Sequence, residues 1–398
     1  MINLYAPGHC FIDIHILQIV PPSCINRDDT GSPKIAFFGD SEQYSVRSRV
    51  SSQCWKAAMR KYFRQIFDDE QVGIRTKYIL QPVARAIMEN DPDMTEEDAM
   101  KRAEAVICLA GISLEDKNGK RAKSLFFISI PQAEALARAA AVIPQEMVDK
   151  ITAESKKGES EEKGKKKKGR DSEKEKLQKL ACDALKSSPA IDIALFGRMA
   201  ASNPDLKVDA AVQVAHAIST HLTHLEQDYF SAVDDGKPDE NTGAGHLGTN
   251  EFMSSVLYRY ASVNVRELFD NIHDLTPDAV LGFVHAFIMS MPTGKINSYG
   301  NNTLPAMICV TVREATPISF VGAFEKPVES DGEGFLKPSE KAFADYMAAS
   351  DKVYGTPSKC YLAGICSDIE GAQRVTAEGL LAELEKDVRE YIAKKGDE

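Results

Sequence analysis

The sequence predicts an α+β protein in which a mainly helical insertion interrupts a β-sheet. Three observations indicate this fold class: a strand-like run near the N-terminus, a mainly helical stretch from 75 to 190, and a return to strand-like patterns after it. With 398 residues, 43% of them hydrophobic, the chain is long enough for two or three domains with buried cores.

The first strand is predicted in the segment "FIDIHIL". Ile12, Ile14 and Ile16 lie on one face of such a strand, and Asp13 and His15 lie on the other, which is the two-residue period of extended backbone. A polar connection rich in Pro, Asn, Asp and Gly follows, and then the short apolar run "IAFFG".

An amphipathic helix is predicted next, with Ser51 and Ser52 as candidate N-caps. Its apolar residues recur at helical spacing: Trp55, Met59, Tyr62, Phe63 and Ile66. Lys56, Arg60 and Arg64 are spaced at i, i+4 and i+8, so they form a cationic stripe beside the apolar one.

The charge around this helix is one-sided. Residues 45–67 contain six Arg and Lys and no acid, with Arg47 and Arg49 just upstream of the helix. Unpaired backbone N–H groups at a helix start, together with Ser51, Ser52 and Gln53, can donate to phosphate oxygens. Because solvated helices normally mix the two signs of charge, the segment favours contact with a nucleic-acid backbone over an ordinary solvated face.

The helical insertion has recognisable boundaries. Thr95 and Asp98 form a capping box, Gly111 is a stop signal, and Pro131 starts a further helix directly after the strand-like "SLFFISI". A Lys/Glu-rich stretch at 156–179 is predicted to be a mobile loop. After it, "AIDIALFGRMA" and "VDAAVQVAHAISTHLTH" are predicted to return to the sheet.

Composition sets further limits on the protein. The net charge is −11, but 156–179 carries eleven basic and six acidic side chains, so the rest of the chain sums to −16. No uncharged apolar run approaches the roughly 20 residues that a membrane span needs, and no signal peptide is recognised. The eight scattered cysteines include no C-x-x-C motif, which indicates reduced thiols. We therefore expect a cytoplasmic protein without membrane contact.

Three apparent chemical motifs are weak. In a strand, His216 and His224 would lie about 26 Å apart at roughly 3.3 Å per residue, so a metal site with His221 is not expected. The glycines of "GAGHLG" (Gly243, Gly245 and Gly248) fit G-x-G-x-x-G but do not follow a buried strand, so a hairpin tip is favoured over a dinucleotide site.

The third motif is the acidic pair Asp28 and Asp29 ahead of the basic helix. Such a pair could hold a divalent metal and cleave RNA, although turn formation is the commoner role of Asp in such a loop. We expect no catalytic residue, no metal and no cofactor.

An ordered set of short segments resembles the backbone subunit of the type I-E CRISPR Cascade complex, the CasC family of the RAMP superfamily. The segments run from about residue 11 to about residue 328: "PSCINRDDTGSPKIAFFG", "RVSSQCWKAAMR", "DIALFGRMAAS", "VAHAISTH", "DYFSAVDD", "AGHLGTNEF", "YRYASVN" and "GAFEKPV". The Lys/Glu-rich loop matches no segment of the family, and the stretch after about 330 matches less clearly.

The resemblance implies a hand-shaped subunit with an RRM-like (ferredoxin-like) palm, an inserted helical finger domain and an extended β-hairpin thumb. The parts are expected at 1–67 (palm), 68–190 (fingers), 191–221 (palm), 222–255 (thumb) and 256–398 (palm and C-terminal segment). Several copies would polymerise along one CRISPR RNA, grip its phosphates, and display its bases to target DNA.

The resemblance also implies RNA-binding residues. Backbone contacts fall on Ser51, Gln53, Lys56 and Arg60, which the charge pattern also selects together with Ser52, Arg47, Arg49 and Arg64. Arg27 and Lys34 match further contacts in the preceding loop, and Met199 and Phe230 match apolar side chains that wedge against a displaced base. Core packing is the alternative role for Met199 and Phe230.

The implied partners are the CRISPR RNA, target DNA through the guide, other copies of the chain in a helical filament, and the large, small and end-capping Cascade subunits. Two alternatives stay open. One is a RAMP-type endoribonuclease that uses Asp28 and Asp29, and the other is an oligomeric scaffold without nucleic acid, whose basic helix docks on an acidic partner.

Overall fold

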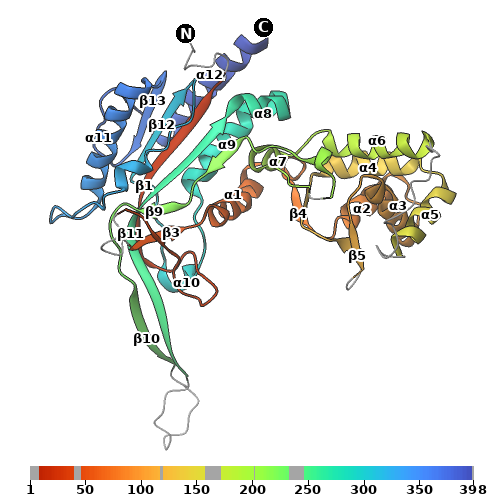
Figure 1. The fold of residues 1–398 in the computed structure, drawn as a ribbon, viewed down its shortest axis with the longest axis horizontal. Helices are drawn as coiled ribbons and strands as arrows, with labels where there is room; N and C mark the ends of the chain where they lie inside the picture. Colours follow the sequence, from red (N-terminus) through yellow and green to blue (C-terminus); the bar gives the residue numbers. More distant parts are fainter. Residues whose placement is uncertain are drawn as a thin grey trace, which may run out of the picture. The chain divides into compact units, whose positions relative to one another are not determined.

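The computed structural model describes residues 9–39, 46–116, 120–156, 172–200, 202–232 and 246–396 (Figure 1). These residues form two compact units, which we call the sheet unit and the helical unit. The sheet unit comprises the described parts of Met1–Tyr62, Val212–Arg266 and Val280–Glu398, and the helical unit those of Phe63–Ala211 and Glu267–Ala279. No helix in the described ranges is long and apolar enough to cross a membrane.

The sheet unit is built on one large, mostly antiparallel sheet. Its strands follow the order β14 (Gln373–Arg374), β13 (Lys359–Gly364), β12 (Met307–Arg313), β1 (Phe11–Ser23), β11 (His246–Asn264), β9 (Ala217–Ser219), β3 (Val46–Val50) and β2 (Ile35–Phe37). β8 (Val212–Val214) and β10 (Glu226–Ala232) pair with other parts of β11, and only the β13–β14 pair is parallel among these strands. The α+β class is confirmed.

The predicted first strand is confirmed as β1, and both of its faces are buried. Ile12, Ile14 and Ile16 are fully buried on one face, and Asp13 and His15 are fully buried on the other. Asp13 accepts hydrogen bonds from the Tyr260 hydroxyl and from a backbone N–H, each over 2.9 Å. A carboxylate buried in this way needs such partners, and β11 and the segment that follows β12 supply them to Asp13.

One face of the sheet carries an aromatic cluster. Helix α11 (Leu336–Tyr354) and the short helix η5 (Val321–Phe324) contribute to it. Phe320 stacks on His15 with ring centroids 4.6 Å apart, and Phe343 packs against both rings. The last helix, α12 (Ala377–Gly396), packs on β13, where Tyr361 donates a hydrogen bond to Asp387.

The other face carries two helices held around one arginine of β11. Helix α1 (Ser52–Ile66) contributes Trp55, whose ring lies 3.8 Å from the Arg259 guanidinium carbon, and α9 (Thr276–Met289) contributes Phe287 at 4.5 Å. Arg259 also donates to Gln18 over 2.6 Å and to the Phe287 carbonyl. Burial lowers the pKa of Arg259 to about 9, and the guanidinium remains charged at neutral pH. Three short helices connect other elements: α8 (Val265–Ile272) and η4 (His273–Leu275) lie between β11 and α9 in the chain, and α10 (Ile296–Tyr299) lies between α9 and β12.

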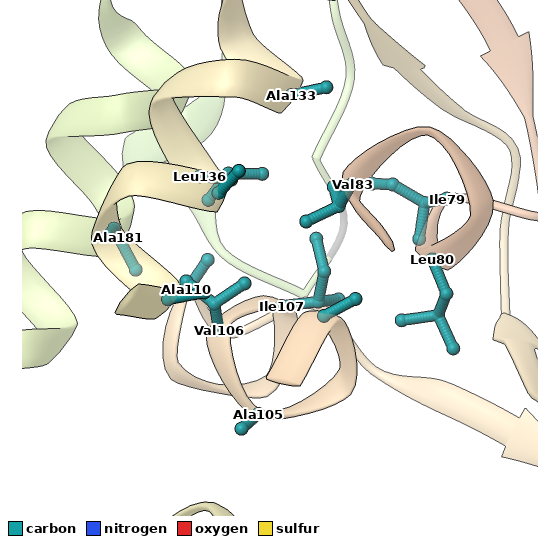
Figure 2. Packing of buried hydrophobic residues seen from close by; sticks show 14 of the residues in the cluster. Ile79, Leu80, Val83, Ala105, Val106, Ile107, Ala110, Ala133, Leu136 and Ala181 are labelled. Atoms are coloured by element: carbon teal, nitrogen blue, oxygen red, sulfur yellow. The ribbon is translucent and has the colours of Figure 1, made fainter. Parts of the chain in front are cut away.

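The helical unit has its own alanine-rich core. Figure 2 shows Val83, Val106, Ile107 and Leu136 pointing into this core from three different helices. The main helices are α2 (Leu80–Asn90), α3 (Glu96–Leu109), α4 (Ile130–Ala141), α5 (Gln145–Lys156), α6 (Ser172–Lys186) and α7 (Ile191–Phe196). Small elements complete the unit: β4 (Ile74–Thr76) with β7 (Phe126–Ile128), β5 (Leu114–Asp116) with β6 (Lys120–Ala122), η2 (Asp69–Gln71) and η3 (Pro204–Leu206).

The predicted helix boundaries in this unit are confirmed. Thr95 accepts a hydrogen bond from the Asp98 N–H at the start of α3. Gly111 follows α3 with a φ of +80°, a conformation that glycine adopts without strain. Ser129 caps α4, and Pro131 lies in its first turn.

Two predictions of secondary structure are wrong. Residues 191–196, expected to form a strand, form helix α7, because Ile191, Asp192 and Ile193 are all buried and Asp192 accepts the Gly73 N–H over 2.8 Å. The expected mobile loop at 156–179 includes Lys156, which ends α5, and 172–179, which belong to α6. The remainder of that predicted loop, 157–171, lies outside the described residues. Strands β8 and β9 confirm the expected return to the sheet after residue 208.

Candidate nucleic-acid interface

The basic helix begins where the sequence predicts. Ser51 is the N-cap: its side chain and its carbonyl both accept from the Cys54 N–H, over 3.3 and 3.0 Å. The Ser51 N–H in turn donates to the Asn26 side chain over 2.8 Å. Ser52 is the first residue of α1 rather than its cap. The start of the helix is therefore fastened to the loop that precedes β2.

Helix α1 separates apolar and cationic side chains. Trp55, Met59 and Phe63 are buried, whereas Gln53, Lys56, Arg60 and Arg64 are partly or fully exposed. Partial burial and the neighbouring Arg60 cation lower the pKa of Lys56. A bound phosphate would relieve this repulsion between like charges. Arg64 lies just past Tyr62, where the sheet unit ends, so the sheet unit itself contains Gln53, Lys56 and Arg60.

The loop ahead of β2 is shaped by Asp28. One carboxylate oxygen accepts three hydrogen bonds: from the Thr30 N–H, the Thr30 hydroxyl and the Ser32 N–H, over 2.8 to 3.0 Å. These bonds lower the pKa of Asp28. Asp28 therefore acts as a turn former, which is the commoner role expected for it, and Asp29 beside it is exposed.

Arg27 and Lys34 flank this turn. Arg27 is exposed and its backbone bridges to Pro33, while the Lys34 N–H donates to the Asn26 carbonyl over 2.9 Å. The Lys34 carbonyl accepts from the Arg49 N–H over 3.0 Å. The backbone thus brings Lys34 and Arg49 together, although they are 15 positions apart in the sequence.

Arg47 was expected to contact RNA, and this prediction is wrong. Its side chain is fully buried and donates to three backbone carbonyls, those of Ser219, Phe324 and Glu325, over 2.8 to 3.2 Å. Burial lowers its pKa to about 10, so it stays charged. Arg47 and Arg49 are two positions apart on β3 (Val46–Val50), so a regular strand places them on the same face. Their surroundings differ: the backbone of 219 and 324–325 encloses Arg47, whereas Arg49 is left partly exposed.

Arg49 is partly exposed and has two side-chain contacts. Its Nε donates to the Ile35 carbonyl over 2.9 Å, and its Nη1 lies 3.1 Å from Nδ1 of His216. A small pocket borders this arginine and is lined by Asn26, Lys34, Ser48 and Arg49, with Met253 at its apolar side. The pocket thus brings two basic residues, Lys34 and Arg49, to one space.

Sequence reasoning missed Lys295. This residue has the left-handed φ of +47° and precedes α10, and its ammonium donates to Asn250 of β11 over 2.6 Å. The neighbouring Gly294 approaches the 24–25 backbone so closely that a Cβ would lie 2.5 Å from the Ile25 carbonyl oxygen. The sequence around Lys295, "TGKIN", shows neither a helical period nor a strand period and contains no run of charge. Only the fold shows that this lysine lies beside the 24–34 loop.

β10 and β11 form a hairpin within 222–255, the segment expected to be the thumb, and Figure 1 shows this hairpin extending away from the sheet. Phe230 is paired with Gly248 across the hairpin and is half-buried. Gly248 thus lies in a strand and not in a glycine loop, while Gly243 and Gly245 lie outside the described residues. The exposed Tyr229 lies on the opposite face of the hairpin from Phe230.

Met199 belongs to the helical unit and is 83% exposed, so the core-packing alternative is wrong for this residue. Gln53, Lys56 and Arg60 belong to the sheet unit, so the structure does not place Met199 in one site with them.

The apparent metal motif of the sequence, His216, His221 and His224, does not form a metal site in the described residues. His221 is buried, donates from Nδ1 to the Leu222 carbonyl over 2.7 Å, and accepts the Val256 N–H at Nε2 over 3.1 Å. It is a satisfied core histidine stacked on Phe335, and burial lowers its pKa. His216 contacts Arg49 instead, and His224 is exposed. Among the described residues, no group of three or more His, Cys, Asp or Glu could hold a metal ion.

Comparisons with known proteins identify relatives of the whole chain. The model of a family of Cas proteins, the CT1975-like proteins, matches residues 12–387. A chain of the solved structure "CRISPR RNA-guided surveillance complex, pre-nicking" has 30% identity and a TM-score of 0.75, covering 96% of this chain and 100% of that one. A chain of another "CRISPR RNA-guided surveillance complex" has 26% identity and a TM-score of 0.67, covering 95% and 99%. No curated protein sequence matches.

The predicted resemblance to a subunit of a CRISPR surveillance complex is confirmed, and the assignment to type I-E stays a prediction. Since the family model spans nearly the whole sequence and a solved relative aligns over its full length, the chain belongs to the CT1975-like family of Cas proteins.

Proposed function

We propose that the chain is a non-catalytic backbone subunit of a CRISPR RNA-guided surveillance complex and that it holds the phosphates of the CRISPR RNA. The observation that carries this proposal is the cationic edge of the sheet unit. Lys56 and Arg60 of α1 lie on one helix face, and the loop that fastens the helix start brings Lys34 and Arg49 together. Phosphate contacts of this kind position a nucleic acid without reading its sequence.

The strand order supports the proposed RRM-like palm. β12, β1, β11 and β9 are neighbours in this order and antiparallel, with α1 following β1 and α9 following β11 along the chain. This is the β-α-β-β-α-β arrangement of ferredoxin-like domains. In this proposal the helical unit supplies the fingers and the β10–β11 hairpin supplies the thumb, whose Phe230 stacks on a displaced base.

The binding mechanism leaves recognition of the target to the guide. A subunit that grips phosphates leaves base edges available, so sequence specificity comes from pairing between the RNA and target DNA. Further copies of the chain would continue the same grip along the RNA, and the large, small and end-capping subunits would complete the complex. The acidic remainder of the chain limits nonspecific attachment elsewhere on its surface.

The role of Asp28 favours binding over cleavage. Its carboxylate oxygen Oδ1 is engaged by the turn, and the described residues include no further carboxylate cluster suited to a metal. In the endoribonuclease alternative, replacing Asp28 and Asp29 with Asn would abolish Mg-dependent RNA cleavage while sparing binding. We expect no cleavage from either protein.

The test is the nucleic-acid content of the full-length protein purified with and without a coexpressed CRISPR array. We expect RNA of uniform length in a multimer, and loss of that RNA in the double variant Lys56→Glu, Arg60→Glu. The matched control is Lys61→Glu with Lys352→Glu, which makes the same charge change at two exposed positions outside the stripe. RNA-free wild-type protein in every preparation, or equal RNA loss in both variants, would contradict the proposal.

A further inference from the structure

His216 lies beside the proposed phosphate-binding residues without having been expected there. It precedes β9, is exposed, and its Nδ1 lies 3.1 Å from Nη1 of Arg49. Arg49 is also anchored to β2 through the Ile35 carbonyl, so the guanidinium is fixed from two sides. The imidazole therefore has a defined place beside Arg49, which together with Lys34 lines the pocket.

The contact with arginine determines the form of the imidazole. A guanidinium can only donate, so Nδ1 of His216 accepts and the ring is neutral, with its proton on Nε2. Protonation of Nδ1 would remove the acceptor and place two cations side by side. The ring therefore cannot carry a second proton while its Nδ1 accepts from Arg49.

The charged groups acting on His216 are both cations. Partial desolvation lowers the pKa of His216 below its usual 6.5, and two cations lower it further: Arg49 of β3 and Lys34 of the loop before β2. The free protein thus holds this histidine neutral near pH 7. A phosphodiester bound among the same cations would act in the opposite direction, because an anion stabilises the imidazolium.

We propose that His216 is a phosphate-binding residue of this surface and that it takes up a proton when RNA binds, so that the grip tightens as the pH falls. The inference rests on the proposed RNA-binding function. On binding, Nδ1 gains a proton from solvent, the Arg49–His216 contact opens, and both side chains donate to phosphate oxygens. The positive charge of the surface formed by Lys34, Arg49 and His216 therefore increases by one when RNA binds.

The test is the affinity of the full-length protein for a fluorescently labelled oligouridine RNA between pH 5.5 and 8, at constant ionic strength. Proton uptake by one group makes affinity rise up to tenfold per pH unit between its free and bound pKa values. The informative variant is His216→Gln, since a glutamine can accept from Arg49 and donate to phosphate but cannot titrate. His224→Gln is the matched control at an exposed histidine.

We expect wild type and the His224 variant to bind about tenfold more tightly at pH 5.5 than at pH 7.5, and the His216 variant to lose most of that difference. Equal pH dependence in all three proteins would overturn the role of His216 and leave RNA binding intact. Absence of RNA binding by the wild type at every pH would instead overturn the proposed function.

Discussion

Phe230 on β10 lies directly opposite Gly248 on β11, and its ring fills the space where any other residue would have a Cβ. An added Cβ at Gly248 would stand 2.6 Å from the ζ-carbon of the Phe230 ring, a distance that real contacts do not reach. The glycine therefore leaves room for the ring on the β10–β11 hairpin.

We predict that Gly248→Ala displaces this ring and weakens RNA binding as much as Phe230→Ala does. Stacking of a base on an aromatic ring is worth about 1–3 kcal/mol, so either change should reduce affinity at least severalfold. Binding of labelled RNA by the two single variants and the double variant measures this. If Gly248 acts only through Phe230, the alanine at 248 has no further effect once Phe230 is removed; additive losses would refute the relationship.

Arg60 should set part of the salt dependence of RNA binding. Each phosphate neutralised on a single strand contributes roughly 0.7 to the slope of log affinity against log salt concentration. We predict that Arg60→Gln lowers the slope by about that amount, whereas Lys61→Gln on the same helix leaves it unchanged. An unchanged slope in the Arg60 variant would mean that this cation does not meet a phosphate.

The two arginines of β3 should differ in what they support. Arg47→Met leaves three buried carbonyls without their donor, so we predict a loss of about 2–4 kcal/mol in the free energy of unfolding, with little change in RNA affinity of the folded protein. Arg49→Met should weaken RNA binding with a smaller loss of stability. Urea unfolding and RNA titration of both variants distinguish the roles, and the reverse pattern would show that the assignment is wrong.

Asp13 and His15 should make opposite contributions to stability in acid. Burial raises the pKa of Asp13 from 3.8 to about 6, so its contribution stabilises below pH 3.8 and is lost as the pH rises through 6. Burial lowers the pKa of His15 from 6.5 to about 3, so its contribution is present above pH 6.5 and is lost as the pH falls towards 3. Between pH 4 and 6 the two slopes offset one another.

Removing the carboxylate should therefore expose the effect of the histidine. Relative to wild type, we predict that the free energy of unfolding of Asp13→Asn falls by roughly 1.4 kcal/mol for each pH unit from 6 to 4. His15→Phe should change in the opposite direction, because only the aspartate then titrates. Urea unfolding at pH 4, 5 and 6 measures both slopes, and parallel curves for all three proteins would contradict the prediction.

Local patterns predicted the elements that depend on local chemistry. The N-caps at Ser51 and Thr95 and the proline start of α4 are set by residues a few positions apart, and all three are present. Charge counting selected Lys56 and Arg60 because a helix places residues four apart on one face. The strand predicted for 191–196 is wrong because a short apolar run that is buried on all sides shows neither a helical period nor a strand period.

The roles of Arg47, His216 and Lys295 could not be predicted locally. Each depends on a partner far away in the sequence: the Ser219 and Phe324 carbonyls for Arg47, Arg49 for His216, and Asn250 for Lys295. Arg47 and Arg49 are both cations of one short strand, and only the segments that surround each side chain separate a structural residue from a candidate ligand contact.

Strand β11 has a mechanical consequence. Its first part, His246–Phe252, pairs with β10 in the hairpin, and the part from Met253 onward pairs with β1 at the centre of the sheet. Because ladder hydrogen bonds run perpendicular to antiparallel strands, a pull along β11 loads the β1–β11 bonds in shear, and they must break together. Force on the hairpin is thus transmitted to the middle of the sheet instead of being absorbed at a hinge.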